Sequence, residues 1–364
     1  MKSPKYRLLV GTGGIGSGIF FQLKGSRTLG RNESRPGYLL DAKDFCKLHI
    51  ICHYVAVLLG SRADEKSAFR TVPVGRVGGD ETGSRLLEMM NRAGMDTAYV
   101  GREKDTATLF SVCFQYPDTS GGNVTTADSA SNRVSVEDIR RAESLFREYR
   151  GAGIALAVPE VPLETRLELL KTATRYDFFR VCALNSEEFS QEVSGELLQN
   201  ADIVSMNRDE AETLVGERYK ADDPQSFLSL VGKKCGSLNP GLKICLTLGA
   251  AGSYGYEKGA WEYTPCARVE PKSTAGAGDA AISGLIAGMV WGLPFILQAR
   301  GQRKELSQAP LETSLDFAAL LAAHSVESVD TINLQADRQT LKETAARLGI
   351  SISEHLAAGL SAAV

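Results

Sequence analysis

The chain has 364 residues, 43% of them hydrophobic and 23% charged, and its formal net charge at pH 7 is −3. This composition is ordinary for a globular protein with a large core, and the small negative charge excludes the strongly basic character of nucleic-acid and anionic-membrane binders. We therefore expect neither a nucleic acid nor a membrane among the partners of this chain.

The N-terminal residues contain only a short apolar run, at 8–10, which is too short for a signal peptide or a transmembrane helix. The seven cysteines are odd in number and scattered, and no Cys-x-x-Cys pair occurs. We therefore expect core thiols in a reducing, cytoplasmic setting, rather than disulfides or a cysteine metal centre.

Short β-rich runs alternate with amphipathic segments along most of the chain. The expected strands are residues 6–10, 71–74, 108–114, 154–158, 178–183, 202–205 and 243–247. The expected helices are residues 81–93, 136–149, 163–176, 187–199, 276–291, 315–326 and 338–348. This alternation predicts an α/β fold with a parallel sheet covered by helices. Residues 117–132, rich in small polar types, are expected to form a long surface loop near a binding site.

Three glycines directly after the first expected strand, Gly11, Gly13 and Gly16, have the spacing of a dinucleotide-binding fingerprint. That motif also needs a helix of ten or more residues and a second strand that ends in an acid. Only residues 17–24 separate Gly16 from Gly25, so this alternative lacks room for its helix. A phosphate-binding P-loop is absent from the sequence as well.

Two polar loops follow the expected strands at 202–205 and 243–247. In the first, Asn207 precedes an amphipathic run and Glu210 lies three residues later, a pattern typical of a helix cap with a capping box. In the second, residues 247–252 read Thr-Leu-Gly-Ala-Ala-Gly. Such glycines let a backbone approach a ligand closely, although a tight turn between strands has the same composition.

The segment at 272–279, Lys-Ser-Thr-Ala-Gly-Ala-Gly-Asp, opens directly into an apolar helical run. The backbone N–H groups of Gly276, Ala277 and Gly278 would then meet the positive end of the helix dipole and form an anion site. Asp279 lies in the first turn, where a carboxylate could take a proton from a hydroxyl that attacks a phosphate. A small-residue helix start used only for close packing is the alternative.

Together these segments resemble the ribokinase family, the PfkB-type sugar and nucleoside kinases. The family signature Asp-Thr-x-Gly-Ala-Gly-Asp is matched at 273–279, except that Ser273 replaces the first Asp. The loop at 247–252 matches the family's nucleotide loop Thr-x-Gly-x-x-Gly, and Asn207 with Glu210 matches its Asn-x-x-Glu motif. The matches run in family order from about residue 71 to residue 291.

The resemblance implies one ribokinase-like α/β domain over residues 1–364, with a central, mostly parallel sheet flanked by helices and a small β lid. The lid strands are expected from about residues 19–40 and 108–126, and a homodimer through the lid is expected as well. The implied activity is ATP-dependent phosphorylation of a hydroxyl group on a sugar, a sugar derivative or a nucleoside, with ATP and Mg²⁺ as cofactors.

The resemblance also implies a role for each matched residue. These roles are Asp279 as general base, Gly276, Ala277 and Gly278 as anion hole, Thr247, Gly249 and Gly252 for the nucleotide, and Asn207 and Glu210 for Mg²⁺, largely through water.

The N-terminal part departs from the family. Gly16 stands where the family's first strand usually ends in an Asp that binds sugar hydroxyls, and the usual Gly-Gly-x-x-x-Asn substrate motif is absent. The candidate substrate residues are Glu160, Lys47, His49 and His53. Because Lys47 and the histidines can carry positive charge, we hypothesise that the acceptor bears an acidic group. The alternative is a surface lysine with two helix-packed histidines.

A second hypothesis is a catalytically silent ligand-binding or regulatory protein on the same fold. The missing acid at Gly16 and the serine at Ser273 motivate this hypothesis. The presence of Asp279, Asn207 and Glu210 argues against it.

Overall fold

A nine-stranded sheet forms the centre of the computed structural model, which describes residues 5–62, 68–118, 120–298 and 303–361. The strand order is β13-β12-β11-β10-β9-β8-β1-β4-β5, and every neighbouring pair from β11 to β5 is parallel. Only β12 and β13, at one edge, are antiparallel to their neighbours. The strands are β1 (Leu8–Thr12), β4 (Arg70–Gly78), β5 (Val100–Glu103), β8 (Gly153–Ala157), β9 (Phe179–Ala183), β10 (Ile203–Asn207), β11 (Lys243–Thr247), β12 (Ser253–Glu257) and β13 (Ala260–Thr264).

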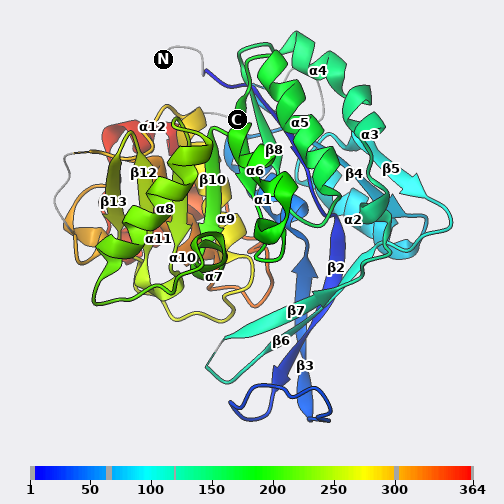
Figure 1. The fold of residues 1–364 in the computed structure, drawn as a ribbon, viewed down its shortest axis with the longest axis horizontal. Helices are drawn as coiled ribbons and strands as arrows, with labels where there is room; N and C mark the ends of the chain where they lie inside the picture. Colours follow the sequence, from blue (N-terminus) through cyan, green and yellow to red (C-terminus); the bar gives the residue numbers. More distant parts are fainter. Residues whose placement is uncertain (1–4, 63–67, 119, 299–302, 362–364) are drawn as a thin grey trace.

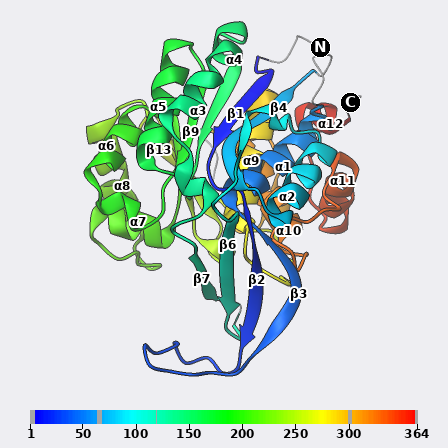
Figure 2. The same ribbon diagram turned by 90° about the vertical axis from the view of Figure 1, so that its right-hand side faces the viewer.

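Helices cover both faces of this sheet (Figures 1 and 2), which is why the central strands are continuous apolar runs. Strands β1 and β8, for example, are buried along their whole length. One face carries α1 (Lys47–Leu59), α2 (Glu81–Arg92), α9 (Ala277–Val290), α10 (Ser314–Ser325), α11 (Arg338–Arg347) and α12 (Glu354–Ser361). The other face carries α3 (Val136–Arg141), α4 (Glu143–Glu148), α5 (Leu163–Arg175), α6 (Glu192–Gln199), α7 (Arg208–Val215) and α8 (Pro224–Leu238). The predicted α/β architecture, a mostly parallel sheet covered by helices, is confirmed.

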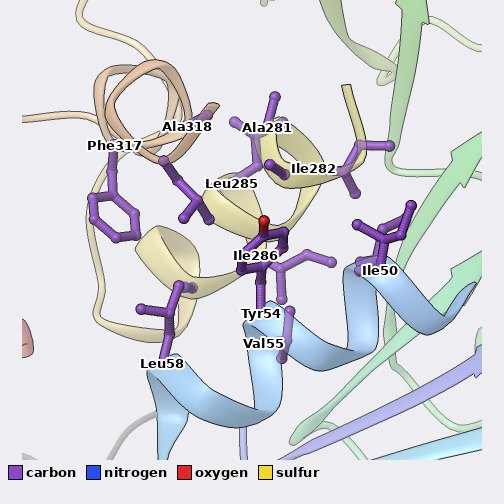
Figure 3. Packing of buried hydrophobic residues seen from close by; sticks show 14 of the residues in the cluster. Ile50, Tyr54, Val55, Leu58, Ala281, Ile282, Leu285, Ile286, Phe317 and Ala318 are labelled. Carbon is purple, nitrogen blue, oxygen red and sulfur yellow. The ribbon is translucent and has the colours of Figure 1, made fainter. Parts of the chain in front are cut away.

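Helix α9 runs through the middle of one core and is apolar on all sides, as a fully enclosed helix must be. Of its residues, only Ala277, Gly278 and Met289 are not buried. Figure 3 shows α9 between the side chains of α1 and those of α10, with Tyr54 and Phe317 on opposite sides. This packing fixes the position of the N-terminus of α9, where the first two residues remain open to ligands.

A second sheet of four strands projects from the central body (Figures 1 and 2), in the order β3-β2-β6-β7. The inner strands β2 and β6 are parallel, and each outer strand is antiparallel to its neighbour. Its strands are β2 (Gly16–Leu23), β3 (Gly37–Phe45), β6 (Leu109–Gln115) and β7 (Gly121–Thr125). We call this sheet the lid. Its strands come from residues 16–45 and 109–125, compared with the expected 19–40 and 108–126.

Several predicted elements need correction. The expected loop at 117–132 contains β7, which forms because its backbone pairs with β6. The expected helix at 136–149 is divided at Ala142 into α3 and α4. The expected helix at 187–199 begins only at Glu192, because the Glu188 carboxylate accepts hydrogen bonds from Arg166 and from the backbone N–H of Asn185 and holds a separate 3₁₀ turn. The structure also has elements that the sequence pattern did not predict, namely β5, α8 and α12.

We expect Gly284→Ala to lower the free energy of unfolding by about 1–3 kcal/mol, because an added methyl group would overpack the contact between α9 and α10. An ideal Cβ at Gly284 would lie 2.6 Å from the Cα of Ala318. Gly236→Ala in α8 is the matched control, since a Cβ there meets nothing within 4 Å. Urea unfolding should show the control at or above wild-type stability. Equal stability of the two variants would contradict the close approach of α9 and α10.

Candidate active site

Two cavities meet at the N-terminus of α9, beyond the carboxyl ends of the parallel strands. We call the larger one, of about 400 Å³, the nucleotide cavity, and the smaller one, of about 270 Å³, the acceptor cavity. Thr274 lines both of them. Ala277 and Gly278 face the first cavity, whereas Gly276 and Asp279 face the second. One turn of helix therefore separates the two compartments.

The loop before α9 is shaped to leave backbone N–H groups open at the helix end. Gly276 is the N-cap residue, with a φ of 80°. A Cβ on Gly276 would lie 2.5 Å from the carbonyl oxygen of Thr331, so glycine is required there on both counts. Gly278 is exposed, and nothing lies within 4 Å of the position of its missing Cβ. This is the arrangement expected of an anion site at a helix N-terminus.

Asp279 and Lys47 form an ion pair at the meeting point of two helices. The Nζ atom of Lys47, the first residue of α1, lies 3.5 Å from Oδ1 of Asp279. Burial raises the pKa of Asp279, and the nearby Lys47 ammonium opposes this rise. In return, the Asp279 carboxylate raises the pKa of Lys47 despite its partial burial. The lysine therefore favours the ionised form of this buried carboxylate, which is the form that accepts a proton.

Glu160 and Lys47 both line the acceptor cavity. Glu160 has a φ of 78°, and its Oε2 accepts a hydrogen bond of 3.2 Å from the backbone N–H of Lys47. Burial raises the pKa of Glu160 to about 7, with the Lys47 charge acting in the opposite direction. The structure thus brings two of the candidate substrate residues to the same cavity as Asp279.

The two histidines take a different place. His49 and His53 line neither cavity, and both side chains are buried on α1. The ring of His49 packs edge-on against Phe45, with centroids 4.9 Å apart. Burial lowers the pKa to about 3 for His49 and to about 4 for His53, so both rings are neutral. Their proposed contact with substrate is therefore corrected, because the helix turns this face of α1 into the protein interior.

The sequence analysis did not identify two residues of the acceptor cavity, Asp44 and Thr331. Asp44, near the end of β3, is 5% exposed and lines the acceptor cavity together with Thr331. The alternation of side chains along an extended segment was the available signal, but which face of β3 points inward depends on its pairing with β2.

The nucleotide cavity is bounded by the loop after β11. Thr247, Gly249 and Gly252 all line it, and the two glycines have φ values of 57° and 87°. A Cβ on Gly252 would lie 2.5 Å from the carbonyl oxygen of Thr264. The opposite wall is formed by small side chains of α10, among them Ala318. This narrow, mostly apolar slot suits a flat aromatic base.

Asn207 and Glu210 form a reciprocal capping box between β10 and α7. Oδ1 of Asn207 accepts from the N–H of Glu210 at 2.9 Å, and Oε2 of Glu210 accepts from the N–H of Asn207 at 2.7 Å. Burial raises the pKa of Glu210 to about 7, while the Asn207 N–H and the Lys47 ammonium favour its ionised form. This carboxylate is thus within electrostatic reach of the Lys47–Asp279 pair. In the described part of the chain, no cluster of three or more His, Cys, Asp or Glu residues could hold a metal ion.

Residues 54–338 match the family described as pfkB family carbohydrate kinase. The match covers more than half of the chain, so the chain belongs to this family. No helix among the described residues is long and apolar enough to cross a membrane.

Solved structures with the same fold include ribokinases and a nucleoside kinase. Ribokinase from Cryptococcus neoformans var. grubii serotype A, in complex with ADP, has a TM-score of 0.70 at 21% identity, with 93% of this chain and 99% of that chain covered. Burkholderia thailandensis nucleoside kinase, in complex with inosine, has a TM-score of 0.70 at 14% identity, with 94% and 99% covered. Arabidopsis thaliana ribokinase, complexed with ribose and ATP, has a TM-score of 0.63 at 17% identity, with 98% and 100% covered.

The raised pKa of Glu160 predicts how stability depends on pH. Burial raises this pKa from 4.5 to about 7, so between these values the folded protein holds a proton that the unfolded chain has released. The free energy of unfolding should therefore fall as the pH rises through this range. In Glu160→Gln, the contribution of Glu160 to this fall of the free energy of unfolding should disappear. Glu164→Gln, at an exposed position four residues on, should keep the wild-type dependence of the free energy of unfolding on pH. Urea unfolding across the range measures both slopes, and equal slopes for wild type and Glu160→Gln would contradict the assignment.

Proposed function

We propose that this member of the pfkB family transfers the γ-phosphoryl group of ATP to a hydroxyl group of a sugar, a sugar derivative or a nucleoside. The observation that carries the proposal is the position of Asp279, whose carboxylate faces the acceptor cavity one helical turn from the nucleotide cavity. A base so placed can reach a hydroxyl on one side of the anion site while phosphates occupy the other side.

The nucleotide cavity is the proposed ATP site. Thr247, Gly249 and Gly252 would contact the nucleotide, and the backbone N–H groups of Gly276, Ala277 and Gly278 would stabilise the charge that develops on the transferred phosphoryl group. The ADP and ATP in the Cryptococcus and Arabidopsis ribokinase structures support a nucleoside triphosphate as donor.

In the proposed reaction, Asp279 takes the proton of the acceptor hydroxyl. The oxygen attacks the γ-phosphorus in line, the bond from this phosphorus to the bridging oxygen breaks, and ADP leaves with the electron pair. The Lys47 ammonium would favour the ionised form of the base before the transfer. Glu160, on the same cavity, would bind another polar group of the acceptor.

The oxygen atoms of Asn207 and Glu210 fit a Mg²⁺ ion that keeps most of its waters, because hard cations prefer oxygen ligands. The capping box occupies Oε2 of Glu210. The Lys47 ammonium acts on this carboxylate and lowers its pKa, against the larger rise that burial causes. When bound, Mg²⁺ would neutralise charge on the phosphate oxygens. The role of Glu210 would be to hold water molecules of the ion's coordination shell.

A catalytically silent protein on the same fold is the alternative function. A ligand-binding protein would not need a carboxylate kept ionised beside an anion site, and the Lys47–Asp279 pair therefore favours the enzyme. All seven cysteines are free, which supports our further proposal of a cytoplasmic location.

We expect Asp279→Asn to lower kcat by about 10²–10⁴-fold with little change in nucleotide affinity, because the amide keeps the shape of the base but cannot accept the proton. Coupled measurement of ADP release with a panel of acceptors gives kcat, and calorimetry gives the affinity for ATP. Asp222→Asn, at an exposed position, is the control and should keep wild-type activity. Acceptor-dependent turnover of the Asp279→Asn protein at a tenth of the wild-type rate would contradict the base assignment, and no turnover by wild type would favour the silent protein.

We further propose a homodimer in which the outer face of the lid is covered by a second copy of the chain. Leu39, Phe110 and Val124, on three different lid strands, are 63%, 40% and 68% exposed. Along β6, Phe110 and Val112 alternate with the residues that face the acceptor cavity, so the apolar side chains share the opposite face. Such a continuous apolar face is rare on a monomer.

Light scattering after size-exclusion chromatography is expected to give twice the chain mass for wild type. Val124→Glu should shift the protein to the monomer mass, because a charge buried in an apolar interface is costly to desolvate. Leu334→Glu, at another exposed apolar residue, 47% exposed, is the matched control and should remain dimeric. A monomeric wild-type protein would contradict the lid dimer.

A further inference from the structure

Asp44 is the acidic side chain that the lid contributes to the acceptor cavity. It is 5% exposed and lines the cavity with Asp279 and Glu160. The charge of Asp279 acts on Asp44 and contributes to the rise of its pKa, of which burial is the main cause. Asp44 and the proposed base therefore face the same enclosed space from the lid and from the central body.

The Asp44 carboxylate is held in place by two neighbours on the lid. The Ser111 hydroxyl donates a hydrogen bond to Oδ2, and Sγ of Cys113 lies 3.3 Å from the same oxygen. Both of these side-chain donors use Oδ2, which leaves Oδ1 without a side-chain donor among the described residues and available to a ligand. Both donors are neutral, which leaves the negative charge of Asp44 without a cationic partner on β6.

The backbone on either side of Asp44 is bound to the loop that supports the anion hole. The N–H of Lys43 donates to Oδ1 of Asp330 at 2.7 Å, and the N–H of Phe45 donates to Oγ1 of Thr331 at 2.9 Å. Thr331 is the residue whose carbonyl oxygen lies against Gly276. Asp44 thus has a fixed position relative to the anion hole, as a group that orients a reacting molecule needs.

The carboxylates of Asp44 and Glu160 fit because two neighbouring positions, Gly18 and Gly14, have no side chain. A Cβ on Gly18 would lie 2.5 Å from Oδ2 of Asp44 and 2.1 Å from Oγ of Ser111. A Cβ on Gly14 would lie 2.2 Å from Oε2 of Glu160. The segment around β2 therefore brings no acid of its own but admits two carboxylates that come from other parts of the chain.

The charges around the cavity argue against an anionic acceptor. Its lining includes the carboxylates of Asp44, Glu160 and Asp279, whereas Lys47 is the one basic residue among the lining residues. The Lys47 ammonium is engaged with Asp279. An acceptor with a carboxylate or phosphate of its own would face three acidic side chains, and the cation in the lining is already paired with one of them. The hypothesis of an acidic acceptor group, based on Lys47 and the two histidines, therefore has no support in this geometry.

We propose that Asp44 is a specificity-determining residue, which binds a hydrogen-bond donor of the acceptor, a hydroxyl or an ammonium group, and excludes acceptors that carry an anionic group. This inference rests on the proposed kinase function and adds to it the substrate contact made by the lid. The contact is independent of the proton transfer at Asp279.

The experiment compares Asp44→Asn and Asp44→Ala with wild type in phosphoryl-transfer assays. The probes are ribose and inosine as neutral acceptors, glucosamine as an ammonium-bearing acceptor, and ribose 5-phosphate as an anionic one. Asp41→Asn, an exposed residue on the same strand, is the matched control. Ser111→Ala is a milder variant that removes one donor to Asp44 if Asp44→Ala fails to fold.

For the best acceptor, we expect KM to rise by about 10- to 100-fold in Asp44→Ala, because the substitution removes a hydrogen bond to a charged group. The KM for ATP should stay unchanged. Asp44→Asn distinguishes an acceptor that donates from a hydroxyl from one that donates from an ammonium group. The amide oxygen still accepts a hydrogen bond from a hydroxyl, but the neutral amide no longer attracts an ammonium. Its KM should therefore rise less for ribose than for glucosamine. Its discrimination against ribose 5-phosphate should weaken, Ser111→Ala should move KM in the same direction, and Asp41→Asn should match wild type.

The proposal is overturned if ribose 5-phosphate is the best acceptor of the wild type, if ribose 5-phosphate is phosphorylated while no neutral or ammonium-bearing probe is, or if acceptor KM is the same in wild type, Asp44→Asn and Asp44→Ala. These results are distinct from failure of the kinase proposal. Turnover that persists in Asp279→Asn removes the base assignment but leaves the effect of Asp44 on KM, whereas turnover with an unchanged KM in the Asp44 variants removes only the inference about Asp44.

Discussion

The ion pair between Lys47 and Asp279 joins the starts of two buried helices, and the site is built around this contact. Helices α1 and α9 pack along their length through one apolar core (Figure 3), so their first turns arrive at the same point. Both helix ends carry partial positive charge, which favours a carboxylate and an incoming phosphate there. The Lys47 ammonium offsets the cost of burying Asp279, because an unpaired buried acid would take up a proton.

The parallel sheet brings the remaining groups to this point. Asn207 and Thr247 are the last residues of β10 and β11, and Glu160 follows the end of β8. The carboxyl ends of parallel strands share one edge of the sheet, so these residues lie at the same edge. The lid forms the last wall of the acceptor cavity. The N–H of Phe45, at the end of β3, donates to Thr331, whose carbonyl oxygen lies against Gly276. The lid and the N-terminus of α9 therefore both lie against Thr331, which fixes the positions of the two cavities relative to each other.

Local features of the sequence predicted the parts of the site that local structure determines. A small-residue loop ahead of an apolar helix is enough to place Gly276 and Asp279, and the spacing of Asn207 and Glu210 is enough to predict their capping box. The contribution of Asp44 could not be predicted, since it depends on the pairing of β3 with β2 and on the position of the lid. The position of the two α1 histidines relative to the cavity could not be predicted for a related reason. Helical spacing shows that His49 and His53 share a face, but not whether that face meets the cavity or the core.

The most direct test is a crystal structure of the protein with a non-hydrolysable ATP analogue and an acceptor bound together. We predict that the γ-phosphate lies at the N–H groups of Gly276 to Gly278, and that the acceptor hydroxyl lies within about 2.6–3.2 Å of the Asp279 carboxylate, as a general base requires. An acceptor bound away from Asp279, or a nucleotide whose γ-phosphate lies outside the N-terminus of α9, would contradict the role of the two helix starts as the catalytic centre.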